Sequence, residues 1–364
     1  MQVEQIARLL DDALGRGVGS AAAVSVGDGG REIFSLVRGH TRRLPTLGEP
    51  AGVDTWFDLA SVTKPIVTAA SAMVLAGEGR LALADPIRRW LPGASSTGTV
   101  GDLLGHGAGC VAHIEFFRDL AKGGLADPRA ELVARASREP AGPPNVAAVY
   151  SDLGYIMAGA IVERAAGAPL EDAFAELVAG PLELGARFAS PSRAPIPGAV
   201  ATELDDVHGL GRGLVCGVVH DENAFYGGGV CGHAGLFARV GDVARFAAAI
   251  VDTAAGAPRG RLRPDVVQRF ATAAPVPDAT WRLGWDTPSA APGVSHAGDR
   301  WPRAGALGHS GFTGTSLWLD LPRRRWVALL TNRVHPTRHA GSADAIKALR
   351  RAVNDAVLDQ LDGA

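Results

Sequence analysis

Apolar residues first recur with the period of an α-helix and then gather in runs typical of β-strands. Residues 3–16 have helical spacing and predict an amphipathic helix. The apolar runs 21–26 and 31–39 predict two strands, because the Gly-Asp-Gly-Gly sequence at residues 27–30 is a strong hairpin signal. The chain is therefore expected to open with a helix followed by a β-hairpin.

The middle of the chain keeps mainly helical spacing. Residues 56–59 predict a short extended segment. The helix that follows is predicted to begin at Ser61 and to end at residues 77–79. Thr99 and Asp102 resemble a capping box before a short helix. Further helices are predicted at residues 153–166, 170–178 and 242–251, whereas the glycine-rich residues 227–235 are expected to be irregular.

Past residue 280 the pattern returns to that of strands. Strands are predicted at residues 281–285, 315–319 and 326–331, and residues 321–324 are expected to join the last two as a hairpin. A final amphipathic helix is predicted at residues 342–361.

Strands at both ends, with helices between them, define the predicted fold class and domains. The fold is expected to be α/β, of the α+β type, with the two ends of the chain building one sheet unit. Residues 1–60 and 255–364 are assigned to this α/β sheet domain, and residues 61–254 to an inserted, mainly helical domain.

Composition and charge limit the class of protein and its partners. The chain has 364 residues, of which 47% are hydrophobic and 20% charged, so it is long enough to bury a large core. The net charge of -2 leaves no basic stripe for phosphates, and no nucleic-acid partner is expected. The N-terminus carries acidic residues where a signal peptide would be basic, and no apolar run is expected to reach the length of a membrane span. These features predict a cytoplasmic protein without a membrane partner.

Ser61 and Lys64 stand three residues apart at the start of a predicted helix, so their side chains share one face, a turn apart. A serine hydroxyl attacks a carbonyl only if a base removes its proton, and a partly desolvated amine can do so. The free N–H groups at this helix start would face an oxyanion. Such a pair occurs by chance in roughly one sequence in eight, and an ordinary capped helix with a solvated lysine is the alternative.

Two further clusters strengthen the interpretation of Ser61 and Lys64 as a catalytic pair. Residues 150–152, Tyr-Ser-Asp, lie in a loop just before a predicted helix, and residues 308–314, Gly-His-Ser-Gly-Phe-Thr-Gly, lead into a predicted strand. The order Ser-x-x-Lys, Tyr-Ser-Asp and His-Ser-Gly is the pattern of the penicillin-recognising serine enzymes.

On these motifs the chain resembles serine hydrolases of the class C β-lactamase type. This group includes penicillin-binding proteins, D-alanyl-D-alanine carboxypeptidases, D-aminopeptidases and esterases. The resemblance covers nearly the whole chain and includes the sequences VHDENA, GHAGLFA and LLTNRVHP at residues 219–224, 232–238 and 329–336. It implies a five-stranded antiparallel sheet flanked by the terminal helices, an all-helical domain, and an active site in the cleft between them.

The resemblance also implies roles for individual residues. Ser61 would be the nucleophile, Lys64 its proton partner, and Tyr150 the base of acylation and deacylation. The backbone N–H groups of Ser61 and Phe312 would form the oxyanion hole. A tyrosine with its ordinary pKa near 10 is a poor base at pH 7, so the ammonium of Lys64 is expected to lower that pKa.

Two positions depart from the family pattern. Asp152 stands where asparagine is usual, and a carboxylate near Lys64 would favour the charged amine and shift the base role to Tyr150. His309 stands where β-lactamases usually have lysine, so the site is expected to lack a fixed positive charge at neutral pH and to regain part of it toward pH 6. The proposed substrate-binding residues are Asp152, His309, Ser310 and Gly311.

The remaining histidines and tryptophans are assigned mostly structural roles. His220, Asp221, Glu222 and His233 are not at a recognised metal-ligand spacing, so no metal and no cofactor are expected. His220 and Asp221 are candidates for supporting or lining the cleft. Tyr155 and four tryptophans are expected to fill the core, although one tryptophan could border the acyl pocket; the four are Trp281, Trp285, Trp318 and Trp326.

The sequence therefore predicts a cofactor-free serine hydrolase that forms an acyl-enzyme at Ser61. Its substrate would be a small ester, or an amide or peptide near a D-residue, with at most weak β-lactam hydrolysis. Two alternatives remain open at this point, an acyltransferase that uses the same site and a non-catalytic relative that binds acyl or peptidoglycan-like ligands. The natural substrate and the oligomeric state are not determined by the sequence.

Overall fold

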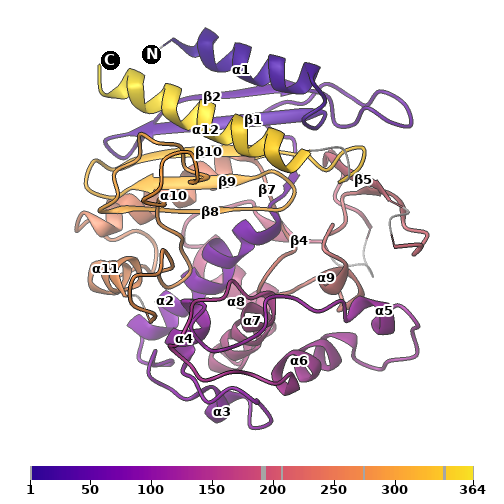
Figure 1. Ribbon diagram of the computed structural model, residues 1–364, viewed down its shortest axis with the longest axis vertical. Helices are drawn as coiled ribbons and strands as arrows, with labels where there is room; N and C mark the ends of the chain where they lie inside the picture. Colours follow the sequence, from indigo (N-terminus) through magenta and orange to yellow (C-terminus); the bar gives the residue numbers. More distant parts are fainter. Residues whose placement is uncertain (1, 190–193, 206–207, 274, 339–341, 364) are drawn as a thin grey trace.

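A computed structural model describes residues 2–189, 194–205, 208–273, 275–338 and 342–363. Its main sheet has five antiparallel strands in the order β2-β1-β10-β9-β8, as the family resemblance implies. The strands are β1 (Ala21–Asp28), β2 (Arg31–Gly39), β8 (Ala306–Ser310), β9 (Ser316–Asp320) and β10 (Arg325–Thr331). Strands from the two ends of the sequence lie side by side in this sheet (Figure 1).

Both predicted hairpins of the main sheet are confirmed. Gly29 and Gly30 join β1 to β2 with φ angles of 59° and 83°, a conformation that glycine adopts without strain. Residues 321–324 join β9 to β10. The strand predicted at residues 281–285 is wrong, because the chain there makes only an isolated bridge from Asp286 to Gly308. The strand at this edge is β8, which was missed because its short sequence ALGHS has little alternation of apolar and polar residues.

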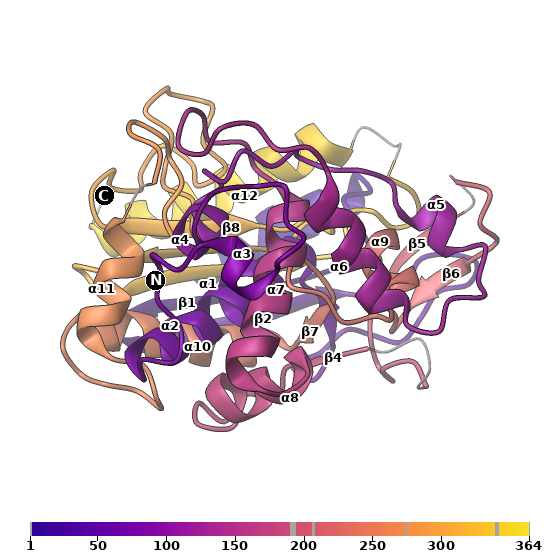
Figure 2. The same ribbon diagram turned by 90° about the horizontal axis from the view of Figure 1, so that it is seen from below.

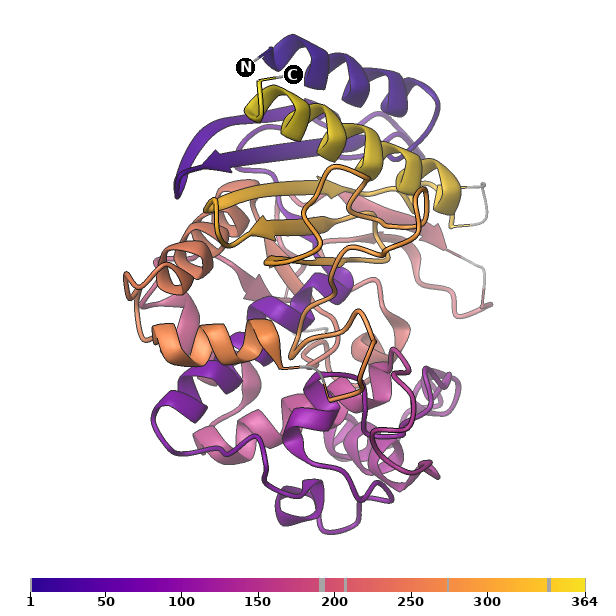
Figure 3. The ribbon, with the colours of Figure 1, turned by 60° about the vertical axis from the view of Figure 1, so that its left-hand side comes forward.

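Two layers of helices cover the two faces of the sheet. The terminal helices α1 (Val3–Gly15) and α12 (Ser342–Leu361) contact each other and lie over one face (Figure 3). Helix α10 (Val240–Ala254) packs on the other face. The side chains of β10 alternate accordingly, with Val327 packed among the residues of the terminal helices and Ala328 in the larger core on the α10 side.

Most of the other helices form the lower part of the molecule (Figures 1 and 2). The predicted capping box is confirmed, because the Thr99 side chain accepts from Asp102 N and the Asp102 side chain accepts from Thr99 N. The helices are α2 (Ala70–Gly77), α3 (Ile87–Trp90), α4 (Val100–Leu104), α5 (Phe117–Leu120), α6 (Pro128–Arg138), α7 (Asp152–Ala166), α8 (Leu170–Phe174), α9 (Glu222–Tyr226) and α11 (Pro264–Thr272).

The middle of the chain is not all helical, which departs from the implied fold. It contributes β7 (Leu236–Ala238) and β4 (Arg187–Phe188), which form a three-stranded sheet with β3 (Phe57–Asp58), and a pair of β5 (Ala201–Asp205) and β6 (Gly213–Cys216). Strand β3 confirms the short extended segment predicted at residues 56–59. Strands β4 to β7 have two to five residues, too short for a period-two pattern to mark them. The division into domains at residues 60 and 254 stays a prediction.

The core contains most of the aromatic residues assigned to it. Trp285, Trp318 and Trp326 are fully buried, and buried Tyr155 donates its hydroxyl hydrogen to Leu104 O at 2.7 Å. Among the described residues, the helical stretch Ala60–Gly77 is long and apolar enough to cross a membrane by length and composition, and 83% of it is buried inside the protein. A mostly buried stretch of this kind is typical of a core helix, so it gives no clear membrane span.

Candidate active site

Ser61 and Lys64 lie at the start of the central helical stretch, immediately after β3. Lys64 is fully buried, and its Nζ donates to Ser61 Oγ at 3.0 Å and to the carbonyl oxygen of His233 at 3.1 Å. Ala60 has a φ of 46°, a left-handed conformation that is strained for a residue with a Cβ. Its N–H donates to Asp58 Oδ1 at 2.8 Å, so the segment that presents Ser61 is held in this conformation by a local contact.

The helix around Lys64 is not the regular α-helix that the sequence predicts. Residues Ala60–Val62 form a 3₁₀ turn, and Lys64–Ala69 form a wider π-helical segment before α2 begins. Such π-helical turns are rare and frequently occur at functional sites. The 3.0 Å contact of Ser61 with Lys64 shows that the three-residue spacing still brings the two side chains together.

The structure places the carboxylate of Asp152 beside Lys64, as the sequence predicts. Asp152 Oδ1 lies 2.8 Å from Lys64 Nζ. Burial alone would lower the pKa of Lys64, but the carboxylate of Asp152 outweighs it and raises that pKa above its ordinary value. Burial would likewise raise the pKa of Asp152, but Lys64 and His113 lower it overall. Lys64 is therefore an ammonium and Asp152 a carboxylate at neutral pH.

The Tyr150 ring lies next to the Lys64 ammonium and packs against two other rings. Lys64 Nζ is 4.8 Å from the centre of the Tyr150 ring, which stacks on Trp281 at 5.2 Å and contacts His106 at 4.8 Å. Trp281 is thus the tryptophan that borders the site. Burial raises the pKa of Tyr150 and the nearby Asp152 adds to this, and together they outweigh the opposite effect of Lys64. The expected lowering of this pKa is wrong, and Tyr150 is a neutral phenol at neutral pH.

His106 fixes the backbone next to Tyr150. Its Nδ1 accepts a hydrogen bond from Ser151 N at 3.1 Å, and its carbonyl oxygen accepts one from Val149 N at 3.0 Å. The Ser151 side chain caps α7 by accepting from Gly154 N at 3.0 Å. Tyr150 therefore projects from a loop that is held on both sides. The role of His106 was missed because its contact with Ser151, 45 residues away in the sequence, is made only by the fold.

The turn after β8 brings Phe312 to the same cleft. Gly311 approaches the chain before Ser61 so closely that a Cβ on it would lie 2.5 Å from Leu59 O. The Thr315 hydroxyl donates to this Leu59 oxygen at 2.8 Å, and the Thr313 hydroxyl donates to Asp58 O at 2.7 Å. The two segments that carry the expected oxyanion-hole N–H groups, those of Ser61 and Phe312, are thus held together.

His309 lies on β8 with a buried, neutral imidazole. Its Nδ1 is 2.9 Å from Ser310 O, a carbonyl that only accepts, so Nδ1 carries the proton. Burial and the Lys64 ammonium lower the pKa of His309 to about 3, against the opposing effects of its backbone contact with Ser310 and of the Asp152 carboxylate. The expected lack of charge at neutral pH is therefore supported, whereas the expected protonation toward pH 6 is wrong.

Two cavities of about 360 Å³ each meet at Ser61, Tyr150 and Phe312. We call the first the carboxylate cavity; it is also lined by Ala60, His113, Glu115, Phe117, Asp152, His208, His220, Asp221, Glu222, Ala234 and Arg338. We call the second the arginine cavity; it is also lined by Trp281, Asp286, His296, His309, Ser310, Gly311, Arg333, Ala343, Ile346 and Arg350. Arg333 and Arg350 give the site fixed positive charges that the sequence analysis did not assign.

Comparison with known proteins places this constellation in a family. The β-lactamase family model matches residues 6–351. The chain belongs to the β-lactamase family. It is 30% identical over 314 residues to a protein of Escherichia coli strain K12 that is provisionally named D-alanyl-D-alanine carboxypeptidase, covering 78% of this chain and 70% of that protein. Membership and this name indicate a hydrolase of the β-lactamase and penicillin-binding-protein type.

Solved structures show the fold of the β-lactamase family over the whole chain. The octameric penicillin-binding protein homologue from Pyrococcus abyssi has a TM-score of 0.74 and 19% identity, covering 100% of this chain and 78% of that one. EstCE1, described as a hydrolase with promiscuous acyltransferase activity, has a TM-score of 0.73 and 21% identity, covering 97% and 98%. At these identities the likeness shows the fold alone.

In this family member the VHDENA segment forms one wall of the carboxylate cavity. Asp221 caps α9 by accepting from Ala224 N at 2.8 Å, and its Oδ1 also lies 2.9 Å from His233 Nε2. Burial would raise the pKa of Asp221, but the contact with His233 lowers it to about 2. His220 and Asp221 both line the cavity, as proposed from the sequence.

The acidic and histidine residues of this wall contact one another and Arg338. His220 Nε2 lies 2.8 Å from Glu203, and Arg338 contacts both Glu203 and Glu222 at 2.6 and 2.5 Å. Within the described residues, no three His, Cys, Asp or Glu side chains are grouped so that they could hold a metal ion. Glu203 and Arg338 were missed because they are brought together only by the fold, 135 residues apart.

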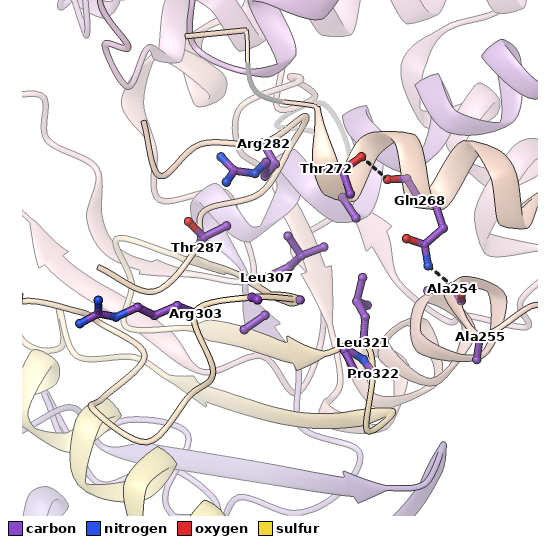
Figure 4. Close-up of a pocket in the computed structure, with 14 residues that line it drawn as sticks. Ala254, Ala255, Gln268, Thr272, Arg282, Thr287, Arg303, Leu307, Leu321 and Pro322 are labelled. Atoms are coloured by element: carbon purple, nitrogen blue, oxygen red, sulfur yellow. Dashed lines mark hydrogen bonds between the residues drawn. The ribbon is translucent and has the colours of Figure 1, made fainter. Parts of the chain in front are cut away.

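A third cavity, of about 390 Å³, lies between β8, α10 and α11 (Figure 4). The five polar side chains that line it each donate to a backbone carbonyl of the protein; they are Gln268, Thr272, Arg282, Thr287 and Arg303. Its lining residues do not include Ser61, Lys64 or Tyr150, so the candidate active site is the cleft formed by the first two cavities.

Proposed function

We propose that this protein is a serine hydrolase that forms an acyl-enzyme at Ser61. The observation that carries the proposal is the contact of Lys64 Nζ with Ser61 Oγ at 3.0 Å and with Asp152 Oδ1 at 2.8 Å. Burying an ammonium in a core helix costs desolvation free energy, and a salt bridge alone often does not offset that cost. Its contact with a serine that opens onto both cavities supports a role in proton handling at Ser61.

In the proposed reaction Tyr150 is the base and Lys64 remains charged. The phenolate form of Tyr150 takes the proton of Ser61, and Oγ forms a bond to the acyl carbon. The bond from that carbon to the leaving oxygen or nitrogen then breaks, and Tyr150 returns the proton to the leaving group. In the second half of the reaction, Tyr150 takes a proton from water, and the water oxygen forms a bond to the acyl carbon. The bond from that carbon to Ser61 Oγ then breaks, Tyr150 returns the proton to Oγ, and the acid is released. Lys64 stabilises the phenolate, and Asp152 keeps Lys64 from giving up its proton.

We propose a small ester, or an amide or peptide near a D-residue, as the substrate. The name of the Escherichia coli relative supports the peptide class. Weak β-lactam hydrolysis remains part of the proposal, since His309 is neutral. Arg333 and Arg350 supply positive charge in the same cavity, however, so charge at position 309 is not the only determinant of binding to a substrate carboxylate.

An acyltransferase is the second candidate function. The two cavities meet at Ser61, so an acyl group could occupy one of them while an alcohol or amine enters through the other. A non-catalytic binding protein is disfavoured, because ligand binding alone would not require a serine in contact with a buried lysine.

The decisive experiment is a turnover panel with the wild type and Ser61→Ala. The panel contains p-nitrophenyl esters, D-amino-acid amides and a chromogenic cephalosporin, each measured with and without an added alcohol acceptor. Ser61-dependent release of product supports the hydrolase, and an ester product formed from the added alcohol supports the acyltransferase. Equal rates in both proteins would refute the proposed function.

A further inference from the structure

Arg350 projects from α12 into the protein behind the turn between β8 and β9. Only 3% of its surface is exposed. Its Nη2 donates to two carbonyl oxygens of this turn, Gly311 O at 2.7 Å and Thr315 O at 2.8 Å. The same turn carries Phe312, whose N–H is the expected second donor of the oxyanion hole.

The guanidinium of Arg350 is charged and buried, and a buried charge of this kind is usually paired with a carboxylate. Among the ion pairs of the described residues, none joins Arg350 to a carboxylate. Its Nε has no hydrogen-bond partner among those residues. Burial lowers the pKa of Arg350 to about 9 and the nearby Arg333 contributes, which still leaves it protonated at pH 7. In surroundings of low dielectric constant, such a charge acts strongly on the nearest dipoles.

One of these dipoles is the peptide unit between Gly311 and Phe312, which contains the expected oxyanion donor. The carbonyl of Gly311 and the N–H of Phe312 belong to one planar peptide unit, and in a trans peptide the two groups point in opposite directions. With the carbonyl oxygen directed to Arg350, the N–H of Phe312 points away from α12. A cation bound at the carbonyl withdraws electron density from the amide and strengthens its N–H as a donor. It also holds the peptide plane, together with the backbone bond from Gly314 N to the same oxygen at 3.0 Å.

We infer that Arg350 is a positioning residue for the oxyanion hole, which it serves by orienting and polarising the peptide between Gly311 and Phe312. This inference rests on the proposed function of Ser61. Arg333 provides a natural comparison, because its Nε donates to Phe312 O at 2.7 Å. That oxygen belongs to the next peptide unit, so the bond from Arg333 does not polarise the N–H of Phe312.

The test compares Arg350→Met and Arg350→Lys with the matched control Arg351→Met. Arg351 stands on the same helix but binds Asp299 and the carbonyl of Ser295, away from the turn. Each variant is assayed with an ester and with the thionoester of the same acyl group. A thiocarbonyl sulfur is a poor hydrogen-bond acceptor, so the ratio of ester to thionoester turnover reports the oxyanion hole and not the general integrity of the fold.

We expect Arg350→Met to lower kcat for the ester roughly tenfold to a hundredfold with little change in KM, less than the loss of a whole oxyanion donor. The ratio of ester to thionoester turnover should fall, Arg350→Lys should recover part of both values, and Arg351→Met should behave as the wild type. If circular dichroism shows that the methionine variant is unfolded, Arg350→Gln takes its place, since its amide can still donate to one carbonyl.

An unchanged ester to thionoester ratio in a folded neutral variant would overturn the inference, even if kcat falls. Equal losses in Arg350→Met and Arg351→Met would also overturn it, because a general effect of charge would then suffice. Failure of the proposed function looks different, since the wild type itself would then show no turnover that depends on Ser61.

Discussion

Lys64 Nζ lies 2.8 Å from Asp152 Oδ1, and this contact keeps Lys64 an ammonium and Asp152 a carboxylate at neutral pH. The Lys64 side chain is completely buried, whereas 18% of the Asp152 side chain is exposed. The carboxylate holds the amine in its charged form, so Lys64 cannot take a proton from Ser61 at neutral pH. It also helps to raise the pKa of Tyr150. Under the proposed function, the same contact leaves the role of base to Tyr150 and keeps that tyrosine mostly protonated at neutral pH.

Ser61→Ala should abolish covalent labelling. A fluorophosphonate probe is expected to add one label to the wild type and none to the variant, because the probe reacts only with an activated hydroxyl. Turnover should fall about a thousandfold or more, while the melting temperature stays close to that of the wild type. Intact mass measurement checks the labelling, and a label that persists in Ser61→Ala would refute the nucleophile assignment.

Lys64→Ala and Tyr150→Phe should show strongly non-additive effects. Each variant is expected to lose most of its turnover, because the phenolate and the ammonium act as one unit in moving the proton. The double variant should then be only slightly slower than the slower single variant. Steady-state rates of all four proteins with one ester form the cycle, and losses that multiply would show that the two residues act independently.

Activity should rise with pH from 6 through 9. The base form of Tyr150 is deprotonated, and its pKa is raised above the ordinary value of 10 by burial and by Asp152. Less than about 0.1% of Tyr150 is therefore phenolate at pH 7, and kcat/KM should increase up to about tenfold per pH unit. Rates of ester hydrolysis, corrected for the spontaneous reaction, give this profile.

Asp152→Asn should move the rising part of this pH profile to lower pH. Without the carboxylate the pKa of Tyr150 and that of Lys64 both fall, so we expect a shift of roughly one pH unit. The variant should be destabilised by about 1–3 kcal/mol, because Asn keeps a hydrogen bond to Lys64 but not the charge. Asp119→Asn, at a surface carboxylate, is the control. A profile that does not move would contradict the role of this ion pair.

His309→Lys should raise the ratio of cephalosporin to ester turnover. Lysine would add a charge-assisted bond to a substrate carboxylate, for a gain of about 1 kcal/mol over neutral histidine. Lowering the pH from 7.5 to 6 should leave this ratio unchanged in the wild type, because the pKa of His309 is about 3. Measurements of both substrates with both proteins at the two pH values check this. A ratio that rises on acidification in the wild type would show that His309 titrates near neutral pH.

Local patterns in the sequence were sufficient for the elements that contain their own signals. The hairpin at Gly29 and Gly30, the capping box at Thr99 and the terminal helices depend on neighbouring residues, and all were predicted. The three motifs also selected Ser61, Lys64 and Tyr150 as candidates, because their order along the chain is distinctive, and the structure brings these side chains together. Strand β8 lacked such a signal, since an edge strand of five residues takes its conformation from its pairing with β9.

The electrostatic properties of the cleft were decided by the tertiary structure. The residue types at positions 150 and 309 suggested a lowered pKa for Tyr150 and an ordinary one for His309, yet burial reverses the first and lowers the second. Burial and the distance between charges depend on segments far apart in the sequence, such as Arg350 of α12 and the turn at Gly311. The sequence therefore determined which chemical groups are present, whereas the fold determined their charges and orientations, because a pKa is set by surroundings that no local pattern encodes.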